Sequence, residues 1–221
     1  YVSSSSTLIG GSTVHVYQRT SAFYLNYSGM PLYMPPNTQI NTYSNSAGQV
    51  VLQSTTTATV AIGGSLNCVI PPNFDVFFDT TAAGAYIFNS TSSQAPINYA
   101  SGAISFKLPP GMDTTVTTLS NGVVLMTTGN AQVPYGNYLN LSMPPSFGVN
   151  ITTTAYSSAW IFNSTATQAA LSYGGNKINF KLPPGIDTSV REESGFVVLM
   201  TTTLARVPYG QYNALNMQLP P

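Results

Sequence analysis

Charged residues are scarce in this chain: its 221 residues include 6 Lys+Arg and 6 Asp+Glu, or 5%, whereas soluble proteins average about 25%. The formal net charge of zero predicts no basic surface for nucleic acid or for an anionic membrane. The chain is nevertheless 43% hydrophobic. An intrinsically disordered protein is therefore excluded, because disorder requires low hydrophobicity and high net charge.

Cysteine and histidine each occur once, as Cys68 and His15. A single Cys forms no internal disulfide, and neither residue has the partners of a Cys-based or His-based metal site. The longest apolar runs, such as residues 197–200, are far too short to span a bilayer. We therefore expect no metal, no cofactor, no nucleic-acid partner and no membrane insertion.

Catalytic patterns are missing as well. The sequence has no GxSxG, phosphate loop, HExxH or EF-hand motif, and one His without a matched nucleophile gives no triad. Glu192 and Glu193 are adjacent, so on a strand they face opposite sides and form no catalytic pair. Asp113 and Asp187 both follow Pro-Pro-Gly and are expected to make turn hydrogen bonds, and Cys68 is expected to be buried and inert. The protein is predicted not to be an enzyme.

Uncharged polar residues fill the place of charges, with 25 Ser, 27 Thr, 18 Asn and 9 Gln. Acid denaturation acts mainly through paired carboxylates, so a chain with few of them is expected to be acid-stable. The first residue is Tyr1 rather than Met, which we interpret as an N-terminus processed after a signal peptide. The expected location is extracellular, at the cell surface or secreted.

An internal repeat organises the sequence. Pro-Pro occurs at 35/36, 71/72, 109/110, 144/145, 183/184 and 220/221, and residues 86–114 resemble residues 160–188 at an offset of 74 without a gap. The 74-residue period predicts three β repeats with bounds 1–73, 74–146 and 147–221, the first of which includes an N-terminal segment resembling a donor strand. Pro-Pro is expected to end strands at the sheet rim, because proline lacks an N–H for the ladder.

The apolar pattern predicts an all-β fold. Short apolar runs alternate with Gly, Pro, Asn and Ser clusters, and no helical spacing of apolar residues persists over three turns. We expect tandem small β-sandwich domains, with a six-unit propeller-like β array as the alternative. The repeated aromatics Phe106, Phe180, Tyr138 and Tyr212 are expected in the core.

Five N-glycosylation sequons occur, at Asn26, Asn89, Asn140, Asn150 and Asn163. Chance alone predicts about four from this composition, so the number shows no enrichment. Asn89 and Asn163, however, lie in identical Ile-Phe-Asn-Ser-Thr strings. These two are the first candidates for covalent glycans in a secreted protein, and the alternative is that each Asn only turns the chain.

Self-association is expected from the terminal segments. The first repeat is the most diverged, and residues 1 to about 20 include the alternating run Thr13, Val14, His15, Val16 and Tyr17. An open β structure is often completed by a strand of another chain. We therefore expect this run to act as a polymerisation strand in a head-to-tail homopolymer.

The charge-poor, Ser/Thr/Asn/Tyr-rich, sequon-bearing β chain resembles surface proteins of thermoacidophilic archaea, and among them the glycosylated subunits of donor-strand filaments called threads. The VPYG turns at 133–136 and 207–210 are similar to those of small Ig-like domains. The resemblance implies a structural, pilus-like subunit of an extracellular filament that polymerises by β-strand complementation. The alternatives are a virion or S-layer-associated spike protein and a carbohydrate-binding β module.

Overall fold

The computed structural model describes residues 3–9, 12–27, 30–44, 49–82, 85–91, 95–100, 103–135, 138–153, 159–165, 169–175, 178–193, 196–209 and 215–221. Within these ranges the chain forms the strands β1 to β24 and no α-helix. The all-β prediction is confirmed. The chain forms two compact units, Tyr1–Asp113 and Thr114–Pro221.

The first unit contains two antiparallel sheets. Its strands are β1 (Ser3–Ile9), β2 (Ser12–Gln18), β3 (Phe23–Tyr27), β4 (Met30–Met34), β5 (Ile40–Ser44), β6 (Val50–Ser54), β7 (Ala58–Ile62), β8 (Leu66–Ile70), β9 (Val76–Ala82), β10 (Ala85–Ser90), β11 (Pro96–Tyr99) and β12 (Ile104–Lys107). The A sheet of this unit has the order β1-β2-β5-β6-β9-β10, and its B sheet has the order β3-β4-β7-β8-β11-β12.

The second unit has the same plan. Its strands are β13 (Thr114–Thr118), β14 (Gly122–Thr127), β15 (Ala131–Tyr135), β16 (Leu139–Met143), β17 (Val149–Thr153), β18 (Ala159–Ser164), β19 (Ala170–Tyr173), β20 (Ile178–Lys181), β21 (Thr188–Glu193), β22 (Phe196–Thr201), β23 (Ala205–Tyr209) and β24 (Leu215–Leu219). Its A sheet has the order β13-β14-β17-β18-β21-β22, and its B sheet has the order β15-β16-β19-β20-β23-β24.

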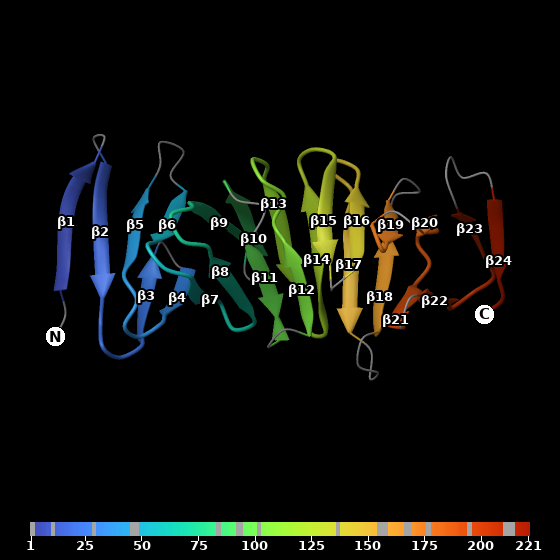
Figure 1. Ribbon diagram of the computed structural model, residues 1–221, viewed down its shortest axis with the longest axis horizontal. Coiled ribbons are helices and arrows are strands. Elements are labelled where there is room, and N and C mark those ends of the chain that lie inside the picture. Colours follow the sequence, from blue (N-terminus) through green and yellow to red (C-terminus); the bar gives the residue numbers. More distant parts are fainter. Residues whose placement is uncertain are drawn as a thin grey trace. The chain divides into compact units, whose positions relative to one another are not determined.

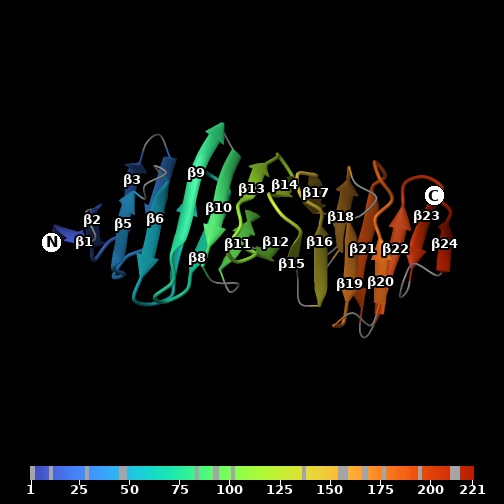
Figure 2. The same ribbon diagram turned by 90° about the horizontal axis from the view of Figure 1, so that it is seen from above.

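Hairpins alternate between the two sheets along the chain, as Figures 1 and 2 show for each unit. The second strand of a hairpin pairs with the first strand of the next hairpin in the same sheet, as in β6·β9 and β14·β17 of the A sheets. In the B sheets the same rule gives β8·β11 and β16·β19. Each Pro-Pro-terminated stretch therefore contributes one hairpin to each sheet. A propeller blade would instead keep four consecutive strands in one sheet.

The core lies between the two sheets of each unit. Strand burial alternates, as in β8, where Leu66, Cys68 and Ile70 are buried and the residues between them are half-buried. In the second unit, the Tyr135 ring of β15 packs edge-on against Trp160 and Phe162 of β18, with ring centroids 5.1 and 5.3 Å apart. These contacts join a B strand to an A strand. The sandwich-like fold is therefore confirmed, while its division into 74-residue domains after residues 73 and 146 stays a prediction.

The Pro-Pro pairs end the B-sheet hairpins, as the sequence predicts. The residue after each internal pair has a positive φ: Asn37 (56°), Asn73 (62°), Gly111 (72°), Ser146 (63°) and Gly185 (68°). Each donates its N–H to a carbonyl at the end of the preceding A-sheet hairpin, over 2.6 to 3.0 Å: Arg19, Ser54, Ser90, Thr127 and Ser164. Gly and Asn adopt this conformation most readily. The bond closes each crossover from the B sheet to the A sheet.

Strand bounds recur along the chain. β10 and β18 begin at Ala85 and Ala159, which are 74 residues apart. β12 and β20 begin at Ile104 and Ile178, with the same spacing. The identical spacing shows that the gapless sequence match of 86–114 with 160–188 carries matching strand bounds.

Candidate functional site

Aspartates follow three of the Pro-Pro crossovers and bind amides of a neighbouring strand. The Asn89 Nδ2 of β10 donates to Asp113 Oδ1 over 2.9 Å. The Asn163 Nδ2 of β18 donates to Asp187 Oδ1 over 2.6 Å. A charged acceptor makes such a bond stronger than a neutral pair. The sequence predicted turn hydrogen bonds for both carboxylates, but the partner found here is a side chain 24 residues earlier.

The third aspartate has different partners in the same place. Asp75 Oδ1 accepts a hydrogen bond from Gln53 Nε2 over 3.0 Å, and Oδ2 accepts one from the Tyr43 hydroxyl over 3.2 Å. Burial raises the pKa of Tyr43, and the Asp75 charge raises it further. Asp75, Asp113 and Asp187 therefore each hold the end of an A-sheet strand, and their first role is structural.

The two identical Asn-Ser-Thr strings are parts of this closure. The backbone carbonyls of the buried Ser90 and Ser164 accept the crossover hydrogen bonds. Thr91 and Thr165 donate their N–H groups to the carbonyls of Asp75 and Gly148, each over 3.2 Å. The string therefore has a packing reason to recur, which is independent of any glycan. Glycosylation of Asn89 and Asn163 stays a prediction, and their amides are half-buried in the folded chain.

The other three sequons lie at different depths. Asn26 is exposed in β3, and Asn140 is half-buried in β16. Asn150 lies in β17 directly opposite Asn163, and its Oδ1 is buried with no hydrogen-bond partner among the described residues. Of the five predicted acceptors, Asn26 is therefore the most accessible to a transferase or to solvent.

The predicted polymerisation strand, Thr13 to Tyr17, lies within β2. This strand pairs with β1 along Ser3↔Gln18 to Ile9↔Ser12 and with β5 along His15↔Thr42 to Tyr17↔Ile40. Val14 is buried with 6% exposure. Both sides of β2 are thus occupied by strands of its own unit, and β1 is the outermost strand of this sheet. Donation of residues 13–17 to another chain stays a prediction and would require β2 to leave this position.

Glu192 of β21 lies close enough to Tyr135 of β15 for its charge to act on the phenol, a feature that sequence reasoning missed. It shares a strand face with the buried Val190, and its Oε1 accepts the Tyr138 N–H over 3.3 Å. Burial raises the pKa of Glu192, while the bond from Tyr138 lowers it. The pKa of Tyr135 is raised by burial first and by the Glu192 charge second. The alternation of Thr188, Val190 and Glu192 was the available signal.

The acidic neighbours do not converge on one site. Glu193 forms an ion pair with Arg191 over 2.5 Å, on the strand face opposite Glu192. The prediction that Glu192 and Glu193 face apart is confirmed. Within the described residues, no group of three or more His, Cys, Asp or Glu side chains is placed to hold a metal ion.

Predictions for the core have mixed outcomes. Cys68 is free and fully buried, and burial raises the pKa of its thiol to about 12. Phe106 and Phe180 are both 1% exposed, as expected. Tyr138 is 60% exposed, so its core prediction is wrong: it lies outside the layer and packs against the Tyr173 ring at 5.8 Å. Tyr212 lies outside the described residues.

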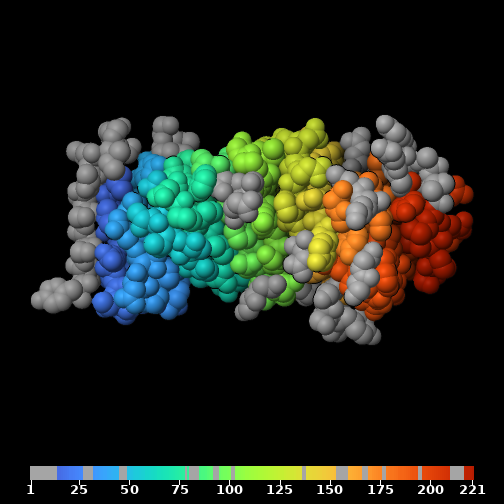
Figure 3. All heavy atoms as spheres, in the orientation of Figure 1, coloured from blue at the N-terminus to red at the C-terminus, as the bar shows by residue number. Residues whose placement is uncertain are grey.

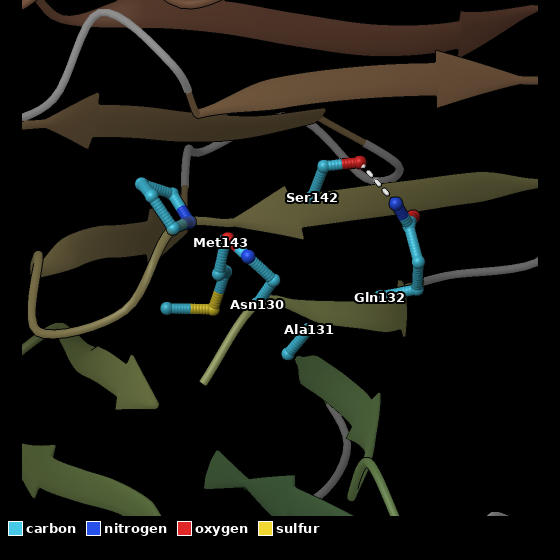
Figure 4. A pocket seen from close by; sticks show the side chains of 6 residues that line it. Asn130, Ala131, Gln132, Ser142 and Met143 are labelled. Atoms are coloured by element: carbon cyan, nitrogen blue, oxygen red, sulfur yellow. Dashed lines mark hydrogen bonds between the residues drawn. The ribbon is translucent and has the colours of Figure 1, made fainter. Parts of the chain in front are cut away.

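A surface depression of about 300 Å³ lies beside the hairpin β15–β16. Figure 4 shows Gln132 and Ser142 on one side of it, joined by a hydrogen bond of 2.6 Å from Gln132 Nε2 to Ser142 Oγ. Its other lining residues are Asn130, Ala131, Met143 and Pro144. None of these side chains is an acid or a base near neutral pH, so the lining includes no group that could activate the Ser142 hydroxyl as a nucleophile. The face drawn in Figure 3 shows close-packed atoms over the described parts of each unit.

Comparison with known protein families, curated proteins and solved structures finds no match to this chain. In the part of the chain that the structure describes, no helix is long and apolar enough to cross a membrane.

Proposed function

We propose that this protein is a structural subunit of an extracellular surface filament, which polymerises head-to-tail by β-strand pairing and carries N-linked glycans. One observation carries the proposal: the strands at the two ends of the sheet orders lack the usual protection against pairing with another chain. They are β1 and β3 in the first unit and β22 and β24 in the second. The proposal concerns assembly and assigns no reaction.

Natural sheets usually block their edges with charges, prolines or bulges, because an open edge is a template for another strand. The sequences of the four outermost strands are SSSSTLI, FYLNY, FVVLMT and LNMQL. None of them contains Lys, Arg, Asp, Glu or Pro. The chain does place charges in other strands, such as Lys107 in β12 and Lys181 in β20. The outermost strands are therefore suited to pair with another copy.

Surface chemistry supports an extracellular setting. Ser, Thr, Asn and Gln recur at strand positions that are not buried, as in Thr115 and Thr117 of β13 and Gln132 of β15. Asn26 is exposed on β3 and is the position at which we expect a glycan first. Such a surface changes little with pH or salt, because it has few groups to titrate or to screen.

A carbohydrate-binding module is the second candidate. Tyr24 and Tyr33 lie side by side on β3 and β4, 76% and 38% exposed, with ring centroids 4.8 Å apart. Exposed aromatic rings of this kind provide apolar faces on which a sugar ring can pack. Glycan-array binding by soluble protein that is lost in Tyr24→Ala would favour this candidate over the filament.

The filament proposal is tested with the purified full chain. Analytical ultracentrifugation over a concentration series should show growing linear assemblies, and negative-stain microscopy should show filaments. Intact-mass and peptide mass spectrometry of native material should find a glycan on Asn26. A chain that stays monomeric at all concentrations, with and without its glycans, would contradict the filament function.

A further inference from the structure

We infer that the contact between copies continues the chain's own ladder: β22 of one copy pairs with β1 of the next, and β24 pairs with β3. The inference rests on the proposed filament function and names the surfaces that form it. The partner is a second copy of this chain. The contact is heterologous, because the two paired surfaces are different, and such contacts propagate.

The pairing rule inside each unit supports this choice. Within each unit, the second strand of a hairpin pairs with the first strand of the next hairpin in the same sheet, as in β2·β5, β14·β17 and β18·β21 of the A sheets. In the A-sheet order, β22 is the last strand and the second of its hairpin, and β1 is the first strand and the first of its hairpin. In the B sheets, β24 and β3 stand in the same relation. Joining copies therefore repeats a contact that this sequence already forms.

The inward-facing apolar residues of β22 are less buried than the matching residues of β14. Val123 and Leu125 of β14 are 0% exposed, and β17 lies beside them. Their counterparts in β22, Val197 and Leu199, are only half-buried. A neighbouring strand in the place that β17 takes beside β14 would remove this apolar area from water, which is the main driving force for association.

The B sheet shows the same deficit. Leu141 and Met143 of β16 are 0% and 2% exposed. Met217 and Leu219, at the corresponding positions of β24, are both half-buried. Two strands at one end of the second unit thus present inward-facing apolar residues that are only partly covered. A partner that supplied one strand to each sheet would cover both sets.

A second rule fixes the register of the new pair. In each A sheet, a backbone carbonyl near the end of one hairpin accepts the crossover bond. The residue two places before that carbonyl pairs with the first residue of the next hairpin in the same sheet. Leu125, two before Thr127, pairs with Val149. Phe162, two before Ser164, pairs with Thr188. In β22 the corresponding acceptor is Thr201, which matches Thr127 because each hydroxyl donates to the carbonyl two residues on over 2.9 Å.

Applying this rule to β1 gives specific pairs. β1 and β2 are registered with Ser3 opposite Gln18, and the accepting carbonyl after β2 is that of Arg19. In the other A-sheet hairpins the accepting residue lies opposite the first residue, as Thr201 lies opposite Thr188. Ser3 lies opposite Gln18, one residue before Arg19, so it is the counterpart of a hairpin's second residue, which pairs with the residue three places before the acceptor, as Asn150 does with Val124. This places Val198 opposite Ser3 of the next copy and Val197 opposite Ser4. A slip of one residue would turn every side chain to the other face. The register is therefore a sharp prediction.

Cysteine cross-linking tests the register, because directly opposed residues have Cβ atoms close enough for a disulfide. Val198→Cys protein is mixed with Ser3→Cys protein and oxidised, and the control mixture contains Val198→Cys with Ser4→Cys. The native Cys68 is fully buried and serves as an internal negative control. We expect at least about ten-fold more heterodimer from the first mixture, since the control pair faces opposite sides of the sheet.

A charge on the β22 edge tests the surface independently. Met200→Lys adds a charge to β22 at a residue that is 64% exposed, and Met126→Lys adds it at the matching residue of β14, which is 38% exposed. Circular dichroism first confirms that both variants fold. We expect Met200→Lys to raise the concentration needed for assembly about ten-fold, whereas Met126→Lys should leave it unchanged, because β14 is already paired on both sides.

The outcomes separate this inference from the proposed function. Filaments that form without preferential Ser3–Val198 cross-linking, or that respond equally to the two Lys variants, would overturn the assigned surfaces and leave the filament function standing. A wild-type chain that never assembles would overturn both. Preferential cross-linking together with the selective effect of Met200→Lys would establish the contact.

Discussion

Strands β14 and β22 share the five residues Val-Val-Leu-Met-Thr, but they differ in how well those residues are covered. In β14, Val123 and Leu125 are 0% exposed, whereas Val197 and Leu199 of β22 are half-buried. β14 lies between β13 and β17, and β22 is paired with β21 at the end of its sheet order. Because the sequences are identical, the difference in exposure measures what a neighbouring strand contributes.

The residue before this shared run also differs between the two strands, and the difference is related to the neighbouring strand. Gly122 begins β14, and a Cβ there would clash with the carbonyl oxygen of Ile151 in β17. Phe196 takes the same place in β22 and is 50% exposed. The β14–β17 pair therefore leaves no room for a side chain at residue 122, whereas β18 carries Ala159 at the same distance before its crossover carbonyl and still pairs with β21. β22 instead carries an aromatic ring at this position.

Truncating the matched leucines should produce the largest difference between the two strands. Leu125→Ala removes a fully buried side chain and should lower the free energy of unfolding by about 3 kcal/mol. Leu199→Ala removes a partly exposed one and should lower it by about 1 kcal/mol in the monomer. Urea denaturation of both variants at low protein concentration measures the difference.

Assembly should reduce the difference between the effects of the two leucine substitutions. If a partner strand covers β22, Leu199→Ala should also weaken polymerisation, whereas Leu125→Ala should affect only folding. Equal losses of monomer stability in the two variants would mean that exposure at β22 does not reflect a missing neighbour, and the comparison with β14 would lose its meaning.

Substitutions at the first residues of β14 and β22 should have the next largest effect on the free energy of unfolding. Gly122→Ala forces β17 to shift and should lower the free energy of unfolding by about 2 kcal/mol, as overpacking usually does. Phe196→Ala removes a half-exposed ring and should change it by less than about 1 kcal/mol. Thermal unfolding measured by circular dichroism checks both. A neutral Gly122→Ala would show that β14 and β17 can separate without loss.

The sequence predicts the sheet layers and strand ends well, and physical reasons explain why. Alternation of apolar residues marks β strands directly, and Pro-Pro predicts where strands such as β8 and β16 end because proline lacks an N–H. Pairing between hairpins is not visible in the same way. The prediction that Thr13 to Tyr17 form a donor strand could not account for β5, which pairs with this run 23 to 27 residues later in the sequence.

The site residues show a similar limit. The equivalence of Asp113 and Asp187 was readable from the 74-residue offset, but their Asn89 and Asn163 partners were not, because a strand brings together residues that are distant in sequence. The same two asparagines also form sequons. The Ile-Phe-Asn-Ser-Thr sequence therefore predicts a glycan site at positions where the structure shows a hydrogen bond to an aspartate. The repeat predicts Tyr138 at a strand position in the core, but the residue lies in the turn just before β16, so repetition alone does not fix burial.

The smallest expected effect concerns the strands that precede β14 and β22. Thr118 of β13 lies opposite Val123, and Glu192 of β21 lies opposite Val197. Burial raises the pKa of Glu192 above the usual carboxyl value of about 4.3, so the folded state binds this proton more tightly than the unfolded state. The contribution to stability is present at low pH and is lost as the pH rises through the folded-state pKa.

Glu192→Gln should therefore be more stable than the wild type at neutral pH, and the two should converge at pH 3. The gain should stay below about 0.5 kcal/mol, because solvent screens this largely accessible group. Urea midpoints at pH 3 and pH 7 measure the effect, with Glu193→Gln as the control for a carboxylate on the opposite face. A variant whose advantage grows as the pH falls would reverse the sign and remove burial as the cause. The matched Thr118 already shows that this position accepts a neutral side chain, so a gain in the variant would identify Glu192 as a departure from β13 that costs stability in the free chain.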